Sequence, residues 1–290
     1  MVFAWFGTLA AAGLLTVDML DVGQGDAILI QAAGKTVLVD AGDRSADTVA
    51  QLKKMGVQRI DLAVATHAHA DHIGRMEDVI RHFEVGLFLD SGHPHTSVTY
   101  ANLAAALQSL KIPWEATVRG TEIALGDVAT LSVLWPTDSP LKDTRSDLNS
   151  NSVVLLLRHG EDDILLTGDA EAPTENGLLA GGIGPIDVLK VAHHGSNHSS
   201  TTAFLRATQP TYALISAGQA NRYDHPGTDT LRRLLQAGAM IYRTDQSGHL
   251  RVVSTGHGVE VLEGSLEEVV AVPLVDPALA TSTQVGRKRR

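Results

Sequence analysis

The stretch Thr66-His67-Ala68-His69-Ala70-Asp71-His72 directly follows the apolar segment 61–66, whose composition is typical of a buried strand. Side chains alternate in an extended segment, so His67 and His69 point the same way, while Asp71 and His72 turn into the next helix. Imidazole and carboxylate groups are ligands of divalent metals. The spacing therefore predicts a pair of metal ions. The alternative, a helix-capping Asp71 among surface histidines, fits poorly because such dense spacing is rare by chance.

Two further clusters lie at the ends of predicted strands. In Leu165-Leu166-Thr167-Gly168-Asp169-Ala170-Glu171, an apolar run leads to Asp169, at the position where ligand sites of α/β proteins usually lie. One carboxylate can bridge two cations, although Asp169 taken alone could equally cap the helix that follows. The segment Lys190-Val191-Ala192-His193-His194-Gly195-Ser196 ends another strand, so His193 and His194 should emerge at the same sheet edge.

A fourth cluster, Asn221-Arg222-Tyr223-Asp224-His225-Pro226, precedes another predicted helix. Its His225 could belong to a functional site, or it could form a hydrogen bond inside the protein ahead of Pro226. Seven of the 13 histidines fall within residues 67–72 and 193–198 or at position 225, which makes accidental clustering a poor explanation. The sequence thus favours one histidine-rich cleft.

The composition excludes several classes of protein. The chain has 290 residues and a net charge of −10, although its last four residues are all basic. An acidic body excludes an ordinary basic DNA-binding module. The absence of cysteine excludes disulfides, thiolate zinc sites and cysteine nucleophiles. With 44% hydrophobic and 19% charged residues, the chain is globular rather than disordered.

Strand-like and helix-like patterns alternate along the chain, and the order β-rich then αβ occurs twice. This order predicts an α/β fold of two similar halves, packed sheet to sheet with the helices outside. The predicted strands are 15–20, 27–32, 36–39, 61–66, 114–119, 129–134, 153–158, 164–167, 186–191, 212–216, 240–244, 250–254 and 259–262. The predicted helices are 48–55, 74–83, 98–110, 172–179, 201–207 and 228–237.

We expect a single domain over residues 14–264. Residues 1–13 are apolar and would be a signal-peptide remnant or a ragged start, which favours an extracytoplasmic location, secreted or periplasmic, over a cytoplasmic one. This run is shorter than the roughly 20 residues that span a bilayer, so no integral membrane segment is expected. Residues 265–290 are expected to form a disordered tail.

The spacing His67-x-His69-x-Asp71-His72, followed by Gly168-Asp169 and His193-His194, resembles the metallo-β-lactamase fold, an αββα four-layer sandwich of binuclear metal hydrolases. Asp40 matches an early structural aspartate of that fold. A nearer resemblance is to the soluble nuclease-like domain of the competence DNA-uptake channel protein and its stand-alone relatives. It rests on Leu20-Asp21-Val22-Gly23-Gln24-Gly25-Asp26-Ala27, on the clusters 166–169 and 190–196, and on Tyr223-Asp224-His225-Pro226. The resemblance covers about residues 15–255 and lacks the channel's membrane helices, so we expect a stand-alone relative.

Carried over residue by residue, the resemblance implies two divalent metal ions, Zn²⁺ or Mn²⁺, with Asp169 as the bridging ligand. The first ion would be bound by His67 and His69, and the second by Asp71, His72 and His194. The choice of His194 over His193 stays open, and the other histidine would face the substrate or support a ligand.

One departure from the family's pattern concerns the first metal. The wider fold usually has another metal-binding histidine before the bridging aspartate, and here Asn149-Ser150-Asn151-Ser152 occupies that region. His93, His95 and His159 are expected to be loop residues. The first ion would then be held weakly, with water or Asn151 completing its shell, and occupancy by a single ion stays open.

The resemblance implies a metal-dependent hydrolase that cleaves phosphodiester bonds through a metal-activated hydroxide, acting as a nuclease on DNA in preference to RNA. Asp71 would orient the attacking water, and His193 and His225 would donate hydrogen bonds to the phosphate. Ser196, Asn221 and His225 would bind the substrate.

Three alternatives are weighed against the nuclease. A small-molecule phosphodiesterase of the phosphorylcholine-esterase kind would need an aromatic cage. The obvious candidates for that cage are Trp114, Trp135, Tyr212 and Tyr223. A non-catalytic scaffold with the same fold would have no need of six ligands. Hydrolysis of β-lactams ranks last because the missing histidine weakens one metal site.

Overall fold

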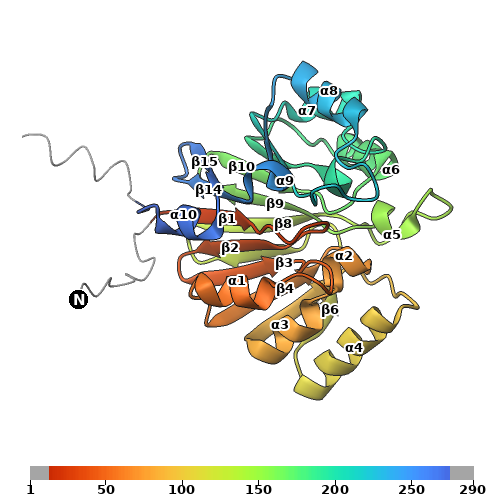
Figure 1. Cartoon of the computed structure of the whole chain (residues 1–290). Helices are drawn as coiled ribbons and strands as arrows, with labels where there is room; N and C mark the ends of the chain where they lie inside the picture. The colour runs from red at the N-terminus through yellow and green to blue at the C-terminus, as the bar shows by residue number, and fades with distance from the viewer. Residues whose placement is uncertain (1–12, 275–290) are drawn as a thin grey trace, which may run out of the picture.

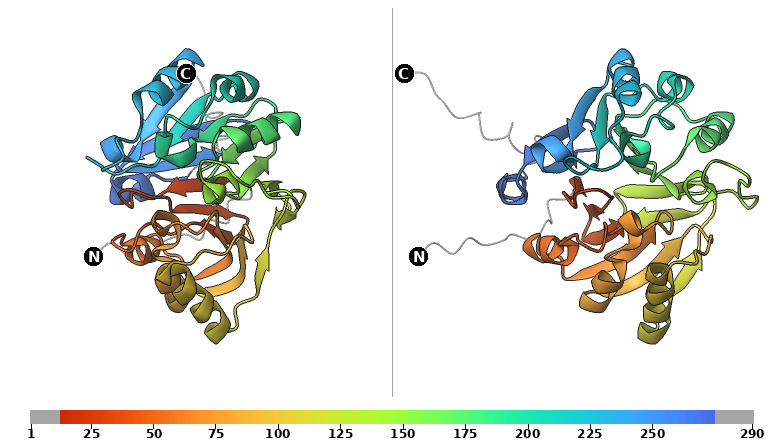
Figure 2. Two further views of the ribbon diagram at one scale, coloured as in Figure 1. Left: turned by 90° about the vertical axis from the view of Figure 1, so that its right-hand side faces the viewer. Right: turned by 45° about the vertical axis from the view of Figure 1, so that its right-hand side comes forward.

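Two β-sheets stack face to face at the centre of the protein, and helices cover the outer face of each sheet (Figure 1). The computed structural model describes residues 13–274. Buried hydrophobic side chains fill one layer between the sheets and one layer between each sheet and its helices. The turned views of Figure 2 show the helices on opposite outer sides of the two sheets. The predicted αββα four-layer sandwich is confirmed.

The first sheet has eight strands. In spatial order they are β15 (Val259–Gly264), β14 (His249–Ser254), β1 (Leu15–Met19), β2 (Ile28–Ala32), β3 (Lys35–Val39), β4 (Arg59–Ala65), β5 (Glu84–Asp90) and β6 (Trp114–Ala116). Strands β15 to β3 pair antiparallel, and β3 to β6 pair parallel. The carboxyl ends of β3, β4 and β5 therefore meet at one edge.

The second sheet has seven strands. In spatial order they are β13 (Met240–Arg243), β12 (Tyr212–Ile215), β11 (Val188–Lys190), β10 (Asp162–Leu166), β9 (Val154–His159), β8 (Ala129–Trp135) and β7 (Glu122–Leu125). Strands β10 to β13 run parallel, so the segments that follow β10, β11 and β12 leave the sheet on one side. These segments carry the second, third and fourth polar clusters of the sequence.

Alternate side chains of the strands build the layer between the sheets. Leu15, Val17 and Met19 of β1 belong to this layer, as do Ile164 and Leu166 of β10. This alternation follows from the period of two residues in a β-strand. Because both sheets contribute a buried face, their relative position is fixed, and so is the position of the loops at their common edge.

Helices complete the two outer layers. Those on the first sheet are α1 (Thr48–Lys54), α2 (Ala70–Ile73), α3 (Met76–His82) and α4 (Val98–Leu110), and those on the second are α6 (Ala172–Ala180), α7 (Thr202–Thr208) and α8 (Thr228–Gln236). Three short helices are α5 (Asp147–Ser150), α9 (Thr244–Ser247) and α10 (Leu266–Ala271). Fully buried side chains such as Leu52 and Leu234 anchor them, each contributing roughly 1.5–3 kcal/mol.

Most predicted elements form within a few residues of their expected limits, and helix 98–110 matches α4. Strand β5 forms where no strand is predicted, because only Phe83 separates it from α3 and no turn residue marks the boundary. Strand β7 also forms outside the predicted elements. The predicted helix 74–83 forms as α3, Met76–His82, and the short helix α2 precedes it at Ala70–Ile73.

Three further expectations concern His159 and the chain ends. His159 is not a loop residue: it ends β9 and is buried, with its Nδ1 2.7 Å from Ser254 Oγ. Within the predicted tail 265–290, helix α10 forms, and its Val269 carbonyl accepts a hydrogen bond from buried Arg251. The expectations for residues 1–12 and 275–290 lie outside the described residues. Across residues 13–274, no helix has the length and apolar character needed to cross a membrane.

Candidate metal centre

The segment after β4 brings its histidines together at the edge of the first sheet. His67 is buried, and its ring centroid lies 4.6 Å from that of His69. His69 is the residue before α2, while Asp71 and His72 lie within that helix. The chain thus changes from extended to helical between the two pairs, so each pair faces a different point. The alternation and the turn into a helix agree with the prediction from spacing.

Asp169 lies between the two pairs. Its Oδ2 is 3.8 Å from His67 Nε2, and its Oδ1 is 3.3 Å from His72 Nε2. The two carboxylate oxygens therefore face different histidines. Ligand atoms of His67, His69 and Asp169 lie within 4.8 Å of one another, and we call these three residues the first group.

Asp71, His72 and His194 form a second group with the same spacing, which we call the second group. His194 Nε2 lies 3.4 Å from Asp71 Oδ2 and 3.6 Å from Asp169 Oδ1. Asp169 thus borders both groups through different oxygens. The structure brings together all six residues that the resemblance names as metal ligands.

Three of the candidate ligand atoms that face the centre are buried and lack protein partners. Among residues 13–274, His72 Nε2, His194 Nε2 and Asp169 Oδ1 make no hydrogen bond. Leaving such a group unsatisfied costs about 1–3 kcal/mol, more where it is charged. Nitrogen and oxygen atoms of this kind converging on one point fit a divalent cation as their common partner.

The outward nitrogens of the histidines are held by neighbouring groups. Asp40 Oδ2 lies 2.7 Å from His72 Nδ1, while Asp40 also accepts hydrogen bonds from the N–H and the hydroxyl of Thr66. His194 Nδ1 lies 3.0 Å from the carbonyl oxygen of Ser216. Such partners fix the ring orientation and leave each Nε2 directed at the centre.

A buried ion pair lies beneath the second group. Lys190 Nζ contacts the Asp26 carboxylate, and both side chains are 1% exposed. Burial would raise the pKa of Asp26, but Lys190, His194 and His72 lower it to about 2. Lys190 also donates a hydrogen bond to the Gly168 carbonyl, one residue before Asp169. This ion pair ties the segment after β10 to the first sheet.

The electrostatics of the centre favour added positive charge. Burial alone would raise the pKa of Asp169, yet His72, His194 and His193 hold it well below its usual range. Burial also opposes protonation of His194, but Asp169 and Asp26 raise its pKa to about 9. Burial and the nearby His72 lower the pKa of His67 far below its usual value, which leaves a neutral ring with a free lone pair.

The family resemblance extends over most of the chain. A family model described as the metallo-beta-lactamase superfamily matches residues 20–140 and 146–219, ranges that contain all six candidate ligands. The chain belongs to the metallo-β-lactamase superfamily. Membership of this superfamily supports the prediction that the protein is a metal-dependent hydrolase.

Curated relatives of this superfamily member include a competence protein and a recombination protein. ComE operon protein 3 of Bacillus subtilis (strain 168) is 31% identical, and the match covers 81% of this chain and 32% of the relative. Competence protein ComA of Neisseria gonorrhoeae is 31% identical with the same two coverages, and Recombination protein 2 of Haemophilus influenzae is 30% identical over 81% of this chain and 28% of the relative. The chain spans about a third of these relatives.

Solved structures confirm the superfamily's fold. Igni18, a metallo hydrolase from Ignicoccus hospitalis KIN4/I, superposes with a TM-score of 0.54 at 16% identity, covering 81% of this chain and 98% of that one. The metallo-beta-lactamase fold protein YhfI from Bacillus subtilis gives a TM-score of 0.53 at 13% identity, covering 87% and 100%. At these identities the likeness shows the fold alone.

The other predicted site residues lie close to the six candidate ligands. His193 Nε2 is 3.7 Å from Asp169 Oδ2, and the ring of His225 is 5.4 Å from that of His193. The side chain of Asn221 is used within its own loop, where Nδ2 donates to the carbonyls of His225 and Gly218. Ser196 is buried. The substrate-binding roles of Ser196 and Asn221 stay predictions.

Sequence reasoning missed two supporting residues at the centre. Glu171 is 2% exposed, and its Oε1 lies 3.3 Å from His193 Nδ1 and 2.8 Å from Arg145 Nη2. Burial would raise the pKa of Glu171, but hydrogen bonds from His193 and Arg145 lower it to about 2. The short spacing from Asp169 to Glu171 was the available signal for Glu171, whereas nothing local marks Arg145.

The region of the absent histidine also differs from expectation. Asn151 does not complete the first group, because its amide is hydrogen-bonded to the backbone of Leu141 and Asp147. Asn149 is the nearer residue, with Nδ2 3.4 Å from the ring nitrogens of His193. The loop after the unpredicted strand β5 brings the ring of His95 to 6.1 Å from that of His69.

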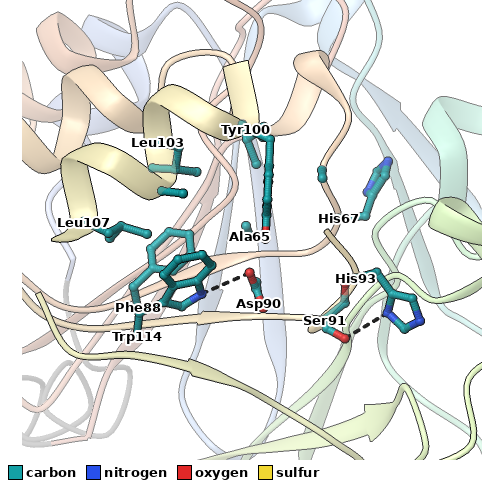
Figure 3. A pocket seen from close by; sticks show the side chains of 13 residues that line it. Ala65, His67, Phe88, Asp90, Ser91, His93, Tyr100, Leu103, Leu107 and Trp114 are labelled. Atoms are coloured by element: carbon teal, nitrogen blue, oxygen red, sulfur yellow. Dashed lines mark hydrogen bonds between the residues drawn. The ribbon is translucent and has the colours of Figure 1, made fainter. Parts of the chain in front are cut away.

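A small cavity lies beside His67 and is too small to hold a substrate. Figure 3 shows Trp114, Phe88 and Tyr100 around it, with His67 at one side. Trp114 Nε1 donates a hydrogen bond of 3.0 Å to Asp90 Oδ2. The cavity volume is ≈ 10 Å³, which is room for about one water molecule.

Proposed function

We propose that this superfamily member hydrolyses phosphodiester bonds and that its substrate is DNA. The observation that carries the proposal is the sharing of Asp169 between two groups of buried ligands, one facing each carboxylate oxygen. Divalent cations bound there would supply Lewis acidity toward phosphate oxygens and the attacking water. Such a pair suits a phosphodiester, whose non-bridging oxygens carry the charge that must be neutralised.

Asp71 is the residue best placed to accept a proton or hydrogen bond from the attacking water. Its side chain is 28% exposed, whereas those of His194 and Asp169 are almost fully buried. Although burial would raise its pKa, His194 and His72 hold the pKa of Asp71 well below its usual range. Asp71 is therefore ionised at neutral pH, with one oxygen facing His194 and the carboxylate edge open to solvent.

His225 is positioned to donate a hydrogen bond to the substrate. Burial, together with His193 and His194, lowers its pKa to about 4, so the ring is neutral near pH 7 and carries one N–H. Asn221 fixes the backbone that carries this ring, because its amide oxygen accepts a hydrogen bond from the backbone N–H of His225 and its amide nitrogen donates one to the His225 carbonyl. Asn221 thus acts on the substrate through His225.

DNA is favoured as the substrate by the relatives. One relative is named a competence protein and another a recombination protein, so a role with DNA is the simplest common theme. The acidic body of the chain, with a net charge of −10, does not oppose this proposal. Bound cations would supply positive charge at the site itself, where the backbone phosphate reacts.

The small-molecule alternative has less support. A choline cage needs several aromatic faces around one point. Trp135 is buried in the second outer layer, and Tyr212 pairs with Tyr242 instead. Tyr223 alone stacks near the centre, 5.7 Å from the ring of His225. A scaffold without activity would not explain why polar ligand atoms are buried without partners.

The proposal is tested with purified protein, several divalent ions, linear and circular DNA, RNA and a chromogenic phosphodiester. Asp169→Ala should abolish cleavage of DNA while circular dichroism shows an unchanged fold. Asp229→Ala is the matched control, because Asp229 lies exposed on α8. Failure of the wild-type protein to cleave any phosphoester with any ion would sink the proposal. Cleavage of the chromogenic ester, with no cleavage of DNA or RNA, would favour the small-molecule alternative.

A further inference from the structure

The two groups of the metal centre are unequal. The second group has four ligand residues when the neighbouring oxygen of Asp169 is included, because His194 Nε2 and His72 Nε2 both face Asp169 Oδ1. The first group has three, namely His67, His69 and Asp169. Zinc in proteins takes four ligands, and a site with fewer protein ligands is completed by water or by another side chain. The first group therefore has room for a fourth ligand around a bound cation.

His193 lies beside that position. Its Nε2 is 3.7 Å from Asp169 Oδ2, and His67 Nε2 is 3.8 Å from the same oxygen. The adjacent His194 instead faces Asp169 Oδ1. The two consecutive histidines are thus divided between the two carboxylate oxygens, one for each group.

The opposite side of the His193 ring is held by a buried charge. His193 Nδ1 lies 3.3 Å from Glu171 Oε1, and the Glu171 side chain is 3% exposed. Arg145 holds both oxygens of Glu171, with Nη2 2.8 Å from Oε1 and Nε 3.3 Å from Oε2. A carboxylate on Nδ1–H fixes the tautomer in which Nε2 carries the lone pair, which is the arrangement typical of metal-binding histidines.

The backbone at His193 and His194 adopts an unfavourable conformation. His193 has φ of 51° and His194 has φ of 54°, in the left-handed region that residues other than glycine rarely adopt. Strain of this kind costs of order 1–3 kcal/mol and persists where surrounding contacts enforce it. Here the His193 N–H donates to the Gly168 carbonyl, which ties the turn to the residue before Asp169.

We propose that His193 is the fourth protein ligand of the first group, binding a divalent cation such as Zn²⁺ or Mn²⁺ through Nε2. Glu171 and Arg145 are positioning residues that hold the His193 ring in the ligating orientation. This role replaces the hydrogen bond to phosphate that the sequence pattern suggested for His193. It rests on the metal centre alone and not on the identity of the substrate.

The test measures metal binding rather than activity. The full chain, stripped of metal with a chelator, is titrated with Zn²⁺ or Mn²⁺ by calorimetry, and bound metal is counted after gel filtration. Wild-type protein should bind two cations. His193→Ala should weaken one site at least tenfold and leave the other unchanged. Glu171→Gln should weaken that same site roughly 10- to 100-fold, because removing a partner of a metal-binding histidine has effects of this size.

His95→Ala is the matched control, since His95 also lies beside the first group but on the side of His69. It should bind both cations with wild-type affinity. Absorption of bound Co²⁺ gives a second readout, because the spectrum of one site should change in His193→Ala and not in His95→Ala. Circular dichroism verifies the fold of each variant.

Three outcomes would overturn the assignment. His193→Ala could bind two cations as tightly as wild type, or lose affinity equally at both sites, or His95→Ala could be the variant that loses the first cation. If His193→Ala does not fold, Glu171→Gln decides the result, and unchanged binding by that variant counts against the proposal. The test measures metal binding and does not use DNA cleavage as a readout. A failure of the His193 assignment is therefore distinguishable from a failure of the proposed function.

Discussion

Asp40 Oδ2 lies 2.7 Å from Nδ1 of His72, on the side of the ring opposite the metal centre. Asp40 is 1% exposed and has a left-handed φ of 59°, so the fold holds it in an unfavourable conformation to reach this ring. The contact fixes which nitrogen of His72 faces Asp169.

Asp40→Asn should weaken cation binding at the second group by roughly 10- to 100-fold and lower the free energy of unfolding by about 1–3 kcal/mol. The asparagine amide lacks the negative charge of the Asp40 carboxylate, which orients His72 and accepts a hydrogen bond from the Thr66 hydroxyl. Calorimetric titration and urea unfolding measure the two effects. Asp47→Asn, at an exposed position nearby, is the control. Unchanged affinity in Asp40→Asn would remove its orienting role.

Lys190→Met should destabilise the metal-stripped protein by about 3–5 kcal/mol, because it leaves the buried carboxylate of Asp26 without its counter-charge. Replacing both members, as Asp26→Asn with Lys190→Met, should cost less than Lys190→Met alone. Urea unfolding of wild type and the three variants completes a double-mutant cycle. A double replacement that costs the sum of Lys190→Met and Asp26→Asn, each made alone, would show that the two charges do not depend on each other.

Gly25→Ala should both destabilise the fold and disturb the second group. A Cβ on Gly25, whose φ is +136°, would lie 2.2 Å from the carbonyl oxygen of Asp71. Gly34→Ala is a matched control, because Gly34 has φ of +74° but nothing within 4 Å of its Cβ position. We expect Gly34→Ala to cost about 1 kcal/mol and leave metal affinity unchanged. Gly25→Ala should cost several times more, and intact metal binding there would contradict the prediction.

The stabilising effect of Glu171 should depend on pH. The pKa of Glu171 in the folded protein is lowered to about 2 from an ordinary 4.5, so its contribution is fully present above pH 4.5 and is lost as pH falls toward 2. Glu171→Gln should therefore be about 1–3 kcal/mol less stable than wild type at pH 7, with a smaller gap near pH 3. Urea unfolding of the metal-stripped proteins at pH 7, 5 and 3 measures the gap. If the difference in stability between wild type and Glu171→Gln did not change with pH, the prediction of an ionised, hydrogen-bonded Glu171 would be wrong.

Removing metal should lower the thermal stability of the protein. A cation present at 100 times its dissociation constant stabilises the folded state by about 2.7 kcal/mol per site. Scanning calorimetry with and without chelator should show the difference, and adding Zn²⁺ or Mn²⁺ should restore it. Asp169→Ala should show little response to added metal because both groups lose their shared ligand. An identical melting temperature with and without metal would count against the centre.

Much of the candidate site is local in the sequence and could be predicted from it. The spacing of His67, His69, Asp71 and His72 determines their relative positions, because an extended segment and a helical turn orient neighbouring side chains in known ways. Helix 98–110 was equally accessible, since Ser97 caps its start and Leu103, Ala106 and Leu107 form its buried face. Such features depend on residues a few positions apart.

The strand limits show where local patterns stop being sufficient. Strand β5 follows α3 after the single residue Phe83, so its apolar residues could as well continue a helix. Its pairing with β4 decides the matter, through hydrogen bonds between segments that the sequence does not mark as partners. The loop after β5 then brings His95 beside His69, which no spacing rule predicts.

By itself, the sequence determined the chemical types of the candidate ligands, the absence of thiolates and the order in which the candidate ligands follow the strands. Only the tertiary structure decided how they are used: that His194 faces Oδ1 of Asp169, that His193 faces Oδ2, and that Glu171 and Arg145 lie behind His193. The physical reason is that side-chain direction at a left-handed turn, and contacts between distant segments, depend on how the two sheets stack. No pattern of neighbouring residues contains that information.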